Sequence, residues 1–280
     1  MKKQALLVGI NNYQGVFNLQ GCINDVTNVR NILKTYFGFT NKDIRVLIDE
    51  RATKTNILSR LGKMVKEAKK GDFLVFHFSG HGSSIRDRHN DELSDHMDEL
   101  ICPFDMNWDN GFITDDMLKE ILIQLKKGVN MEIILDSCHS GTGTRDFIPG
   151  SMEGDVITRC VNNRFLRPPV DIECRSDGDE DKLSPAKTFR TDSEIVLNHI
   201  LWAACKDNQT SADALIDGQY SGAFSYYFCK HIRENAGEIT REDLHTRIKN
   251  SLKYNNFSQV PQLECRNDLK SENIFKHEAV

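Results

Sequence analysis

Continuous apolar stretches alternate with stretches of helical periodicity along the first half of the chain. The run at 3–10 is apolar over most of its length and suits a strand buried on both faces, and further short strands are predicted at 44–48, 73–78 and 131–135. Between them, apolar residues recur every three or four positions, which predicts helices over 25–37, 55–69 and 116–127. This alternation predicts an α/β fold with a mostly parallel sheet and helices on both faces.

The regular pattern stops near residue 145 and resumes near residue 195. The intervening segment, 146–194, is polar, acidic and punctuated by proline and glycine, which predicts a flexible linker; a long surface loop is the alternative interpretation. Beyond it, the pattern predicts a strand over 195–205 and helices over 223–235 and 241–254. We therefore expect one domain made of a first part, 1–145, the linker, and a second part, 195–280.

Composition and charge argue against several classes of function. The 280 residues are 39% hydrophobic and 28% charged, as in ordinary globular proteins. The net charge of −5 gives no support for a nucleic-acid partner, which usually requires a basic face. No apolar run reaches about 18 residues, so no membrane span is expected.

The chain start and the cysteines bear on the cellular compartment. The first ten residues resemble a signal peptide, but the apolar run ends at Asn11 and no small-residue cleavage site follows, which favours a buried strand. The eight cysteines include no C-x-x-C pair, so zinc and thioredoxin-type chemistry are unsupported. Without a signal peptide, we expect free thiols in a reducing cytoplasm.

Three loops that follow predicted strands carry the candidate chemistry. Residues 79–82 follow the strand at 73–78, residues 136–141 follow the strand at 131–135, and residues 21–25 lie after the first strand. In open parallel sheets, ligands bind beyond the carboxyl ends of the strands. The topology alone is therefore expected to bring these loops to one edge of the sheet.

His81 and Cys138 are the candidate catalytic pair in two of these loops. A thiol is a strong nucleophile as its thiolate, and a neighbouring histidine can take its proton and later protonate a leaving amine. Glycine-flanked turns would expose both side chains. The backbone N–H groups of Gly82 and Cys138 are the candidate donors to an oxyanion.

The order of histidine before cysteine is that of caspases, and several stretches make the resemblance specific. They are 19–25, 78–83, 136–141, 203–213 and 260–264. The chain resembles metacaspases and orthocaspases, the non-animal branch of the caspase superfamily, although Asp-Ser-Cys-His-Ser-Gly around Cys138 departs from the animal caspase signature.

This resemblance implies a caspase-like three-layer sandwich with a central sheet of about six strands. It also implies a cysteine endopeptidase with His81 and Cys138 as its dyad. The parts 1–145 and 195–280 would correspond to the large and small caspase subunits. No extension precedes the first strand, so we expect a type I metacaspase-like catalytic domain without a prodomain.

The resemblance further assigns the pocket for the residue before the cleaved bond (P1) to Cys22, Asp25, Ser79 and Asp136. Two carboxylates suit a guanidinium, which can bind both, and lysine would fit as a point charge. An aspartate substrate would be repelled. The alternative for Asp25 is the N-cap of the helix that follows it.

An acidic stretch from 86 to 116 contains far more carboxylates than basic residues. A calcium ion bound among these carboxylates would relieve their mutual repulsion. The alternative is a surface loop whose charges are solvated by water. The family resemblance implies activating Ca²⁺ near the active site. The residues that match its ligands best are Asp98, Asp115, Asp116 and Asp146.

The linker carries basic residues that an Arg- or Lys-specific protease could cleave in its own chain, so autoprocessing is a hypothesis. These residues are Arg159, Arg164, Arg167, Arg175, Lys182, Lys187 and Arg190. We expect protein or peptide substrates with a basic P1 residue, and a monomer.

Two alternatives remain open at this point. In an α/β-hydrolase with a cysteine nucleophile, the cysteine would precede the histidine in the sequence. A glycine would also stand two positions before the cysteine, where this chain has Asp136. A catalytically inactive caspase-like scaffold or calcium-sensing regulatory protein would be expected to lose the dyad, which is intact here.

Overall fold

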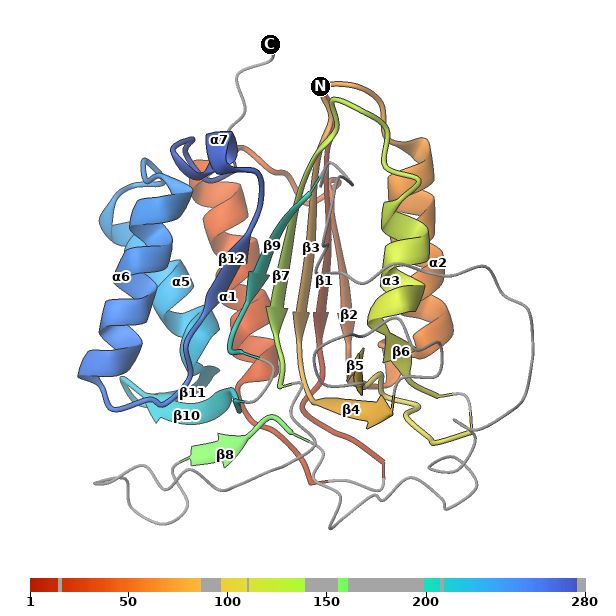
Figure 1. The fold of residues 1–280 in the computed structure, drawn as a ribbon, viewed down its shortest axis with the longest axis vertical. Helices are drawn as coiled ribbons and strands as arrows, with labels where there is room; N and C mark the ends of the chain where they lie inside the picture. The colour runs from red at the N-terminus through yellow and green to blue at the C-terminus, as the bar shows by residue number, and fades with distance from the viewer. Residues whose placement is uncertain are drawn as a thin grey trace.

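The computed structural model describes residues 1–14, 17–86, 97–109, 111–138, 156–160, 199–206 and 209–275. At its centre lies a six-stranded sheet in the order β12-β9-β7-β3-β1-β2 (Figure 1). All neighbouring strands run parallel except β12, which is antiparallel to β9. The strands are β1 (Lys3–Gly9), β2 (Ile44–Ile48), β3 (Phe73–Ser79), β7 (Asn130–Asp136), β9 (Ile200–Ala203) and β12 (Gln262–Glu264).

Helices cover both faces of this sheet (Figure 1). One face is covered by α1 (Cys22–Tyr36), α5 (Ala223–Glu234) and α6 (Arg241–Tyr254), and the other by α2 (Lys54–Glu67) and α3 (Asp115–Leu122). A short 3-10 helix (Asp49–Arg51) and α7 (Asn267–Lys270) complete the described helices. Each face has its own hydrophobic core, centred on residues such as Phe76 and Ile133 on one side and Trp202 and Phe228 on the other. The predicted three-layer α/β sandwich with a mostly parallel sheet is confirmed.

Two small antiparallel sheets lie beyond the carboxyl ends of the central strands (Figure 1). The first contains β4 (Gly82–Arg86), β5 (Met97–Ile101) and β6 (Ile113–Thr114). The second, in the order β11-β10-β8, contains β8 (Val156–Thr158), β10 (Ala212–Ile216) and β11 (Gln219–Gly222). The sequence pattern did not predict these strands, because two to five partly polar residues give no clear period.

Two predicted elements are shorter by several residues in the structure. The helix predicted over 116–127 ends at Leu122, because the next residues form tight turns in which Gln124 N donates to Ile121 O and Leu125 N to Leu122 O. Leu125 is nevertheless buried, so its apolar side chain extended the helical pattern without belonging to the helix. The strand predicted over 195–205 is β9, Ile200–Ala203.

The register of the sheet aligns the loops that carry the candidate chemistry. Ser79 at the end of β3 pairs with Gly9 of β1 on one side and with Asp136 of β7 on the other. The close approach of α1 requires Gly9, because a Cβ there would lie 2.8 Å from Cys22 O. Residues 79–82, 136–138 and the start of α1 therefore meet at one rim of the sheet.

Part of the expected linker is ordered. Residues 156–160 lie among the described residues, and β8 forms the edge of the second rim sheet. The rest of 146–194, with the other basic residues named above as cleavage candidates, lies outside the described residues.

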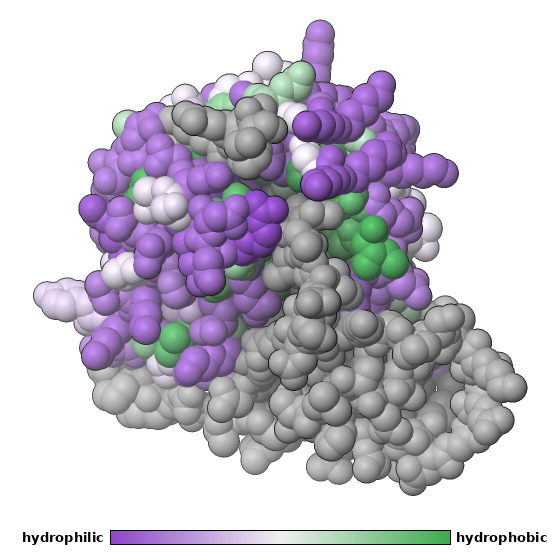
Figure 2. Space-filling view, turned by 45° about the horizontal axis from the view of Figure 1, so that its top comes forward, coloured by the Kyte–Doolittle hydropathy of each residue, from purple (hydrophilic) through white to green (hydrophobic). Residues whose placement is uncertain are grey.

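The described part of the face in Figure 2 is mostly hydrophilic, with scattered hydrophobic residues. Among the described residues, the exposed large hydrophobic side chains are those of Met1, Ile123, Leu215 and Tyr254. No helix in this part of the chain is both long and apolar enough to span a membrane.

Candidate active site

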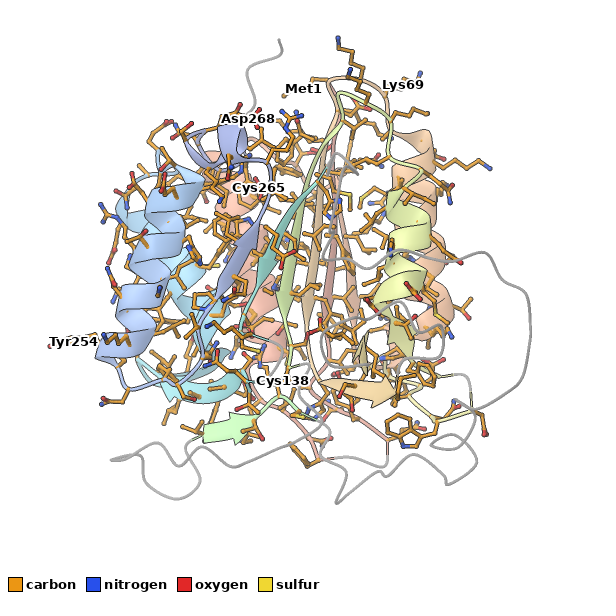
Figure 3. All side chains as sticks on the ribbon, in the orientation of Figure 1. Met1, Lys69, Cys138, Tyr254, Cys265 and Asp268 are labelled. Carbon is orange, nitrogen blue, oxygen red and sulfur yellow. The ribbon has the colours of Figure 1, made fainter. Side chains whose placement is uncertain are left out.

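Cys138 and His81 lie in adjacent turns at the carboxyl end of the sheet. Each stands two residues beyond a strand end, and the two strand ends pair through Ser79 and Asp136. Figure 3 shows Cys138 at this rim, whereas the labelled Met1, Lys69 and Cys265 lie toward the opposite end. Both side chains, Cys138 and His81, are 0% exposed.

The glycines beside His81 allow the two turns to touch. A Cβ on Gly82 would lie 1.8 Å from the carbonyl oxygen of Cys138, so no other residue fits there without moving the backbone. A Cβ on Gly80 would lie 2.5 Å from the hydroxyl of Tyr13. That hydroxyl accepts a hydrogen bond from His81 N (2.9 Å) and fixes the turn.

The His81 ring lies between two aromatic side chains, with centroids 4.7 Å from Tyr13 and 4.8 Å from Phe17. Its Nε2 lies 2.8 Å from Phe17 O, so Nε2 carries the proton and Nδ1 is left to accept one. Burial lowers the pKa of His81 to about 4, against the opposing effect of the Phe17 and Arg159 backbone. The imidazole is thus neutral at pH 7, as a general base requires.

The Cys138 sulfur contacts the backbone of Ser211, which lies just before β10. Ser211 N donates to Sγ at 2.6 Å, and Sγ lies 3.3 Å from Ser211 O. Burial, followed by the neighbouring Cys205, raises the pKa of Cys138, so the thiol is protonated in this arrangement. The catalytic roles of Cys138 and His81 remain predictions, and these contacts describe a resting thiol.

A buried cluster of three carboxylates surrounds the guanidinium of Arg159, which follows β8. Nη2 donates to Asp25 Oδ2 (2.7 Å) and Asp213 Oδ1 (3.0 Å). Nη1 donates to Ser79 Oγ (2.7 Å) and lies 3.4 Å from Asp136 Oδ1. The three acids and the arginine are all 0% exposed. We name Asp25, Asp136 and Asp213 the acidic pocket.

The structure brings the four predicted pocket residues together around this one cation. Asp25, Ser79 and Asp136 contact it directly. Burial raises the pKa of the Cys22 thiol, and the nearby Arg159 opposes this rise. The N-cap alternative for Asp25 is wrong: the N-cap of α1 is Gly21, and Asp25 lies within the first turn.

Asp213 was not predicted. It lies within the stretch 203–213 that carried the resemblance, but a strand that short does not indicate which way an acid points. In the structure, its Oδ2 accepts hydrogen bonds from Gln20 N (2.6 Å) and Gly21 N (3.1 Å), which aims Oδ1 at the guanidinium. Asp136 is fixed similarly by Ser211 Oγ (2.7 Å) and Ser225 N (3.0 Å).

The crowding of acids changes the titration of Asp25. Burial raises its pKa to about 7, and the neighbouring Asp136 and Asp213 add to this, while Arg159 opposes it. The pocket therefore holds more negative charge than one cation neutralises, and part of that charge depends on pH near neutrality.

Of the predicted oxyanion donors, Gly82 N donates to the carbonyl oxygen of Arg159 at 3.0 Å. For Cys138 N, the role stays a prediction. Arg159 N in turn donates to Ser211 O at 3.0 Å, so the backbone of Arg159 is held on both sides.

The predicted calcium ligands are only partly described. Asp115 and Asp116 lie in the first turn of α3, directly after Thr114, which pairs with Leu100 of β5. The backbone of Asp98 lies two residues before Leu100, so it approaches the same corner, whereas Asp146 lies outside the described residues. Within the described ranges, no group of three or more His, Cys, Asp or Glu is arranged to hold a metal.

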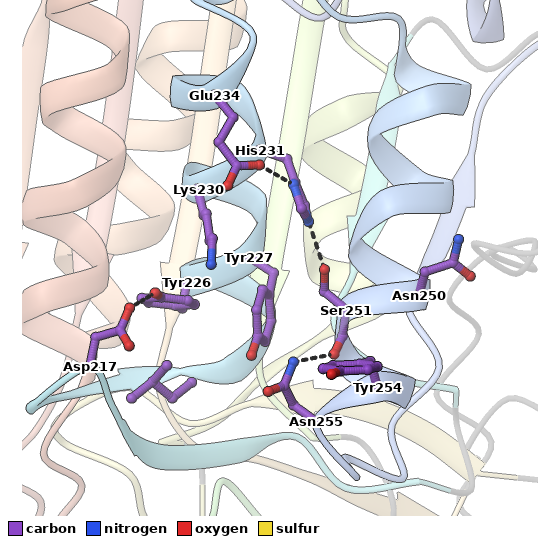
Figure 4. Close-up of a pocket in the computed structure, with 11 residues that line it drawn as sticks. Asp217, Tyr226, Tyr227, Lys230, His231, Glu234, Asn250, Ser251, Tyr254 and Asn255 are labelled. Carbon is purple, nitrogen blue, oxygen red and sulfur yellow. Dashed lines mark hydrogen bonds and ion pairs between the residues drawn. The ribbon is translucent and has the colours of Figure 1, made fainter.

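A second hollow, of about 600 Å³, lies between α5, α6 and the β10–β11 hairpin (Figure 4). His231 spans it, with Nδ1 2.8 Å from Glu234 and Nε2 2.8 Å from Ser251 Oγ. Tyr226 donates to Asp217 beside it. None of the predicted catalytic or pocket residues lines this hollow.

Comparison with known proteins identifies the family. Residues 3–145 match the model of the metacaspase, peptidase C14 domain. Metacaspase-1 of Pyricularia oryzae is 33% identical over 98% of this chain and 74% of its own length. Metacaspase-1A of Aspergillus fumigatus is 33% identical over 98% of this chain and 71% of its own length. The chain belongs to the metacaspase family.

Solved structures agree on the fold of this metacaspase. The protein GSU0716 of Geobacter sulfurreducens has a TM-score of 0.71 at 23% identity, covering 98% of both chains. Caspase-1 of Spodoptera frugiperda has a TM-score of 0.58 at 12% identity, covering 94% of this chain and 86% of its own. The family makes the chain a cysteine peptidase and excludes the α/β-hydrolase alternative.

Proposed function

We propose that this metacaspase cleaves peptide bonds after arginine, and less efficiently after lysine, with Cys138 as nucleophile and His81 as general base. The observation that carries the specificity is the acidic pocket, in which Asp25, Asp136 and Asp213 surround a buried guanidinium. An aspartate in the same place would add a fourth buried negative charge with no partner.

The geometry favours arginine over lysine. The two terminal nitrogens of the guanidinium reach separate groups: Nη2 binds Asp25 and Asp213, while Nη1 binds Ser79 and the backbone carbonyl of Asp136 (3.2 Å). A lysine ammonium is one nitrogen on a thinner chain and cannot reach both sets of acceptors. We expect kcat/KM to be about tenfold or more lower for lysine, corresponding to roughly 1.4 kcal/mol.

In the proposed reaction, His81 Nδ1 takes the proton of the Cys138 thiol, and the thiolate attacks the carbonyl carbon of the P1 arginine. The developing oxyanion occupies the position where Gly82 N now meets a carbonyl oxygen. His81 then protonates the leaving amine, and water hydrolyses the thioester to release the new carboxylate.

We also propose that calcium activates the enzyme at the corner formed by Asp98, Asp115 and Asp116, with Asp146 as a further ligand, and that the linker is self-processed. The support for calcium is the convergence of the β5 backbone and the first turn of α3 at one corner. When bound, Ca²⁺ would neutralise these carboxylates through oxygen coordination.

The test uses peptides ending in Arg, Lys or Asp, assayed with wild type and Cys138→Ala, in calcium and in chelator. Cleavage is expected to be strongest after Arg and absent in Cys138→Ala, with calcium-dependent rates. Strongest cleavage after Asp would overturn the specificity, and equal rates in chelator would overturn the calcium role. An inactive scaffold would also resist labelling of Cys138 by a thiol-alkylating Arg peptide.

A further inference from the structure

Residues 156–160 lie at the rim beside Gly82 and Ser211, with β8 as an edge strand, and we call the place that they fill the cleft. Thr158 pairs with Ala212 and Val156 with Ala214 in the antiparallel ladder between β8 and β10, and Cys160 bridges to Gly82. An extended peptide that adds a strand to an exposed sheet edge is a common mode of peptide recognition. This segment therefore occupies the cleft as a bound peptide would.

The register of this strand places Arg159 where a P1 residue belongs. Its side chain fills the acidic pocket, its carbonyl oxygen accepts from Gly82 N, and its N–H donates to Ser211 O. Ser211 O is also within 3.3 Å of Cys138 Sγ. Cys138 Sγ and the backbone N–H of Arg159 thus contact the same carbonyl group, while the carbonyl group of Arg159 contacts Gly82 in the turn of His81.

We propose that the segment 156–160 is the chain's own first substrate: Cys138 cleaves the Arg159–Cys160 bond within the same molecule, and the uncut segment excludes other substrates until then. This rests on the proposed function and adds to it the first bond cut, its intramolecular course and the latency of the uncut enzyme.

The proposed cut needs no co-reactant except water. The Cys138 thiolate forms a bond to the carbonyl carbon of Arg159, and the C–N bond to Cys160 breaks as His81 delivers the thiol proton to the Cys160 nitrogen. Water then replaces the sulfur, which leaves a carboxylate at Arg159 and restores the thiol. The new chain end is the amine of Cys160.

The uncut strand fills the pocket beside reactive groups that are themselves buried. Cys138 and His81 are 0% exposed, and the sulfur lies against Ser211. The pocket is filled by Arg159, which is also 0% exposed. A peptide in solution must displace an occupant tethered to the same chain, whose effective concentration is on the order of millimolar.

The residues of β8 also indicate which substrate sequence the enzyme prefers before the cleaved bond. Ile157 packs against the hydrophobic core on the α2–α3 side and Val156 against the core on the α5–α6 side. Both are β-branched, as is Thr158, which suits an extended strand. A peptide with the order Val-Ile-Thr-Arg is therefore the expected substrate class.

The first experiment follows self-cleavage by intact-mass spectrometry. Wild type is expected to yield a fragment beginning at Cys160, and Arg159→Gln is expected not to yield it. Arg175→Gln, elsewhere in the 146–194 segment, serves as a matched control and should still yield it. Arg159→Lys, which keeps the charge, should yield it more slowly. Wild type that cleaves Arg peptides with the 159–160 bond intact would overturn the inference; wild type that cleaves no basic peptide would instead overturn the proposed function.

The second experiment measures occupancy of the cleft without any cleavage. Binding of a labelled Val-Ile-Thr-Arg peptide is compared between Cys138→Ala and Cys138→Ala/Arg159→Gln. Removing the internal arginine is expected to tighten binding at least about tenfold, because the tethered competitor is weakened. Cys138→Ala/Arg175→Gln should bind like Cys138→Ala. Equal affinities in all three would contradict the latency.

The third experiment tests the intramolecular course. The first-order rate constant of self-cleavage should be unchanged over a hundredfold dilution. A rate constant that falls in proportion to protein concentration would show cleavage between molecules and would overturn this part of the inference.

Discussion

Strand β7 carries two fully buried acids, four positions apart, with opposite kinds of surroundings. Near its start, Glu132 meets one buried guanidinium: Arg241 Nε and Nη2 lie 2.8 Å from Oε1, and Trp202 Nε1 donates to Oε2 at 2.6 Å. At its end, Asp136 belongs to the acidic pocket, where three carboxylates share one arginine.

The difference distinguishes a buried ion pair that stabilises the fold from a site that binds a cation. At Glu132, each buried charge has its counterpart on an element of the central sandwich, so the cluster holds α6 against the sheet. At Asp136, negative charge is in excess, and the cation is Arg159, which directly follows the edge strand β8. A surplus of buried like charge raises carboxyl pKa values and is typical of a site that binds a cation.

The largest effect is expected on stability, at the cluster of Glu132 and Arg241, in which the buried charges are balanced. Arg241→Leu, made in the Cys138→Ala background to prevent self-cleavage, should lower the free energy of unfolding by about 3–5 kcal/mol, because it leaves Glu132 charged, buried and unpaired. Denaturant unfolding measures this. Arg159→Leu in the same background should lose less than half as much, because β8 can leave the cleft and let water reach the acids. Equal losses of unfolding free energy in the two variants would contradict the distinction between the two clusters.

The next effect is on specificity. Asp213→Asn should lower kcat/KM for Val-Ile-Thr-Arg by about 30-fold or more, because truncating a buried charge pair costs roughly 2 kcal/mol or more. Asp217→Asn is the matched control on the exposed turn of the same hairpin and should change the rate little. If both variants cleave like wild type, Asp213 does not contribute to the pocket.

A smaller effect is expected from pH. The pKa of Asp25 is raised to about 7, so the carboxyl becomes protonated as pH falls through neutrality and loses its attraction for a guanidinium. Peptide affinity of Cys138→Ala/Arg159→Gln, which lacks both the titrating thiol and the competing internal arginine, should therefore weaken between pH 8 and pH 6. Titration by fluorescence anisotropy measures it, and the same variant with Asp25→Asn added should show a flatter profile. The same slope in both would assign the pH dependence to another group.

The sequence predicted the layers and the rim well, because both follow from period and topology. The mostly apolar run at 73–78 is long enough to show burial on both faces, and a parallel sheet necessarily gathers its strand ends. That is why the loops that carry Asp25, Ser79 and Asp136 could be placed at one edge before the fold was known, whereas their assignment to one pocket came from the family resemblance.

The sequence did not reveal what fills the pocket. Arg159 was one of several basic residues in a segment expected to be a linker, and its role depends on pairing with β10, more than fifty positions away. Such long-range pairing of a three-residue strand leaves no local pattern. Asp213 was missed for the same reason.

The central claim is that the surplus charge of the acidic pocket selects a cation at P1. The most direct measurement compares kcat/KM for Val-Ile-Thr-Arg with that for the same peptide carrying citrulline, which keeps the shape of arginine but lacks its charge. The account predicts that citrulline is cleaved at least about 100-fold less efficiently, as expected when buried acids are left without a cation. Cleavage of the two peptides within about threefold of each other, a difference below 1 kcal/mol, would contradict it.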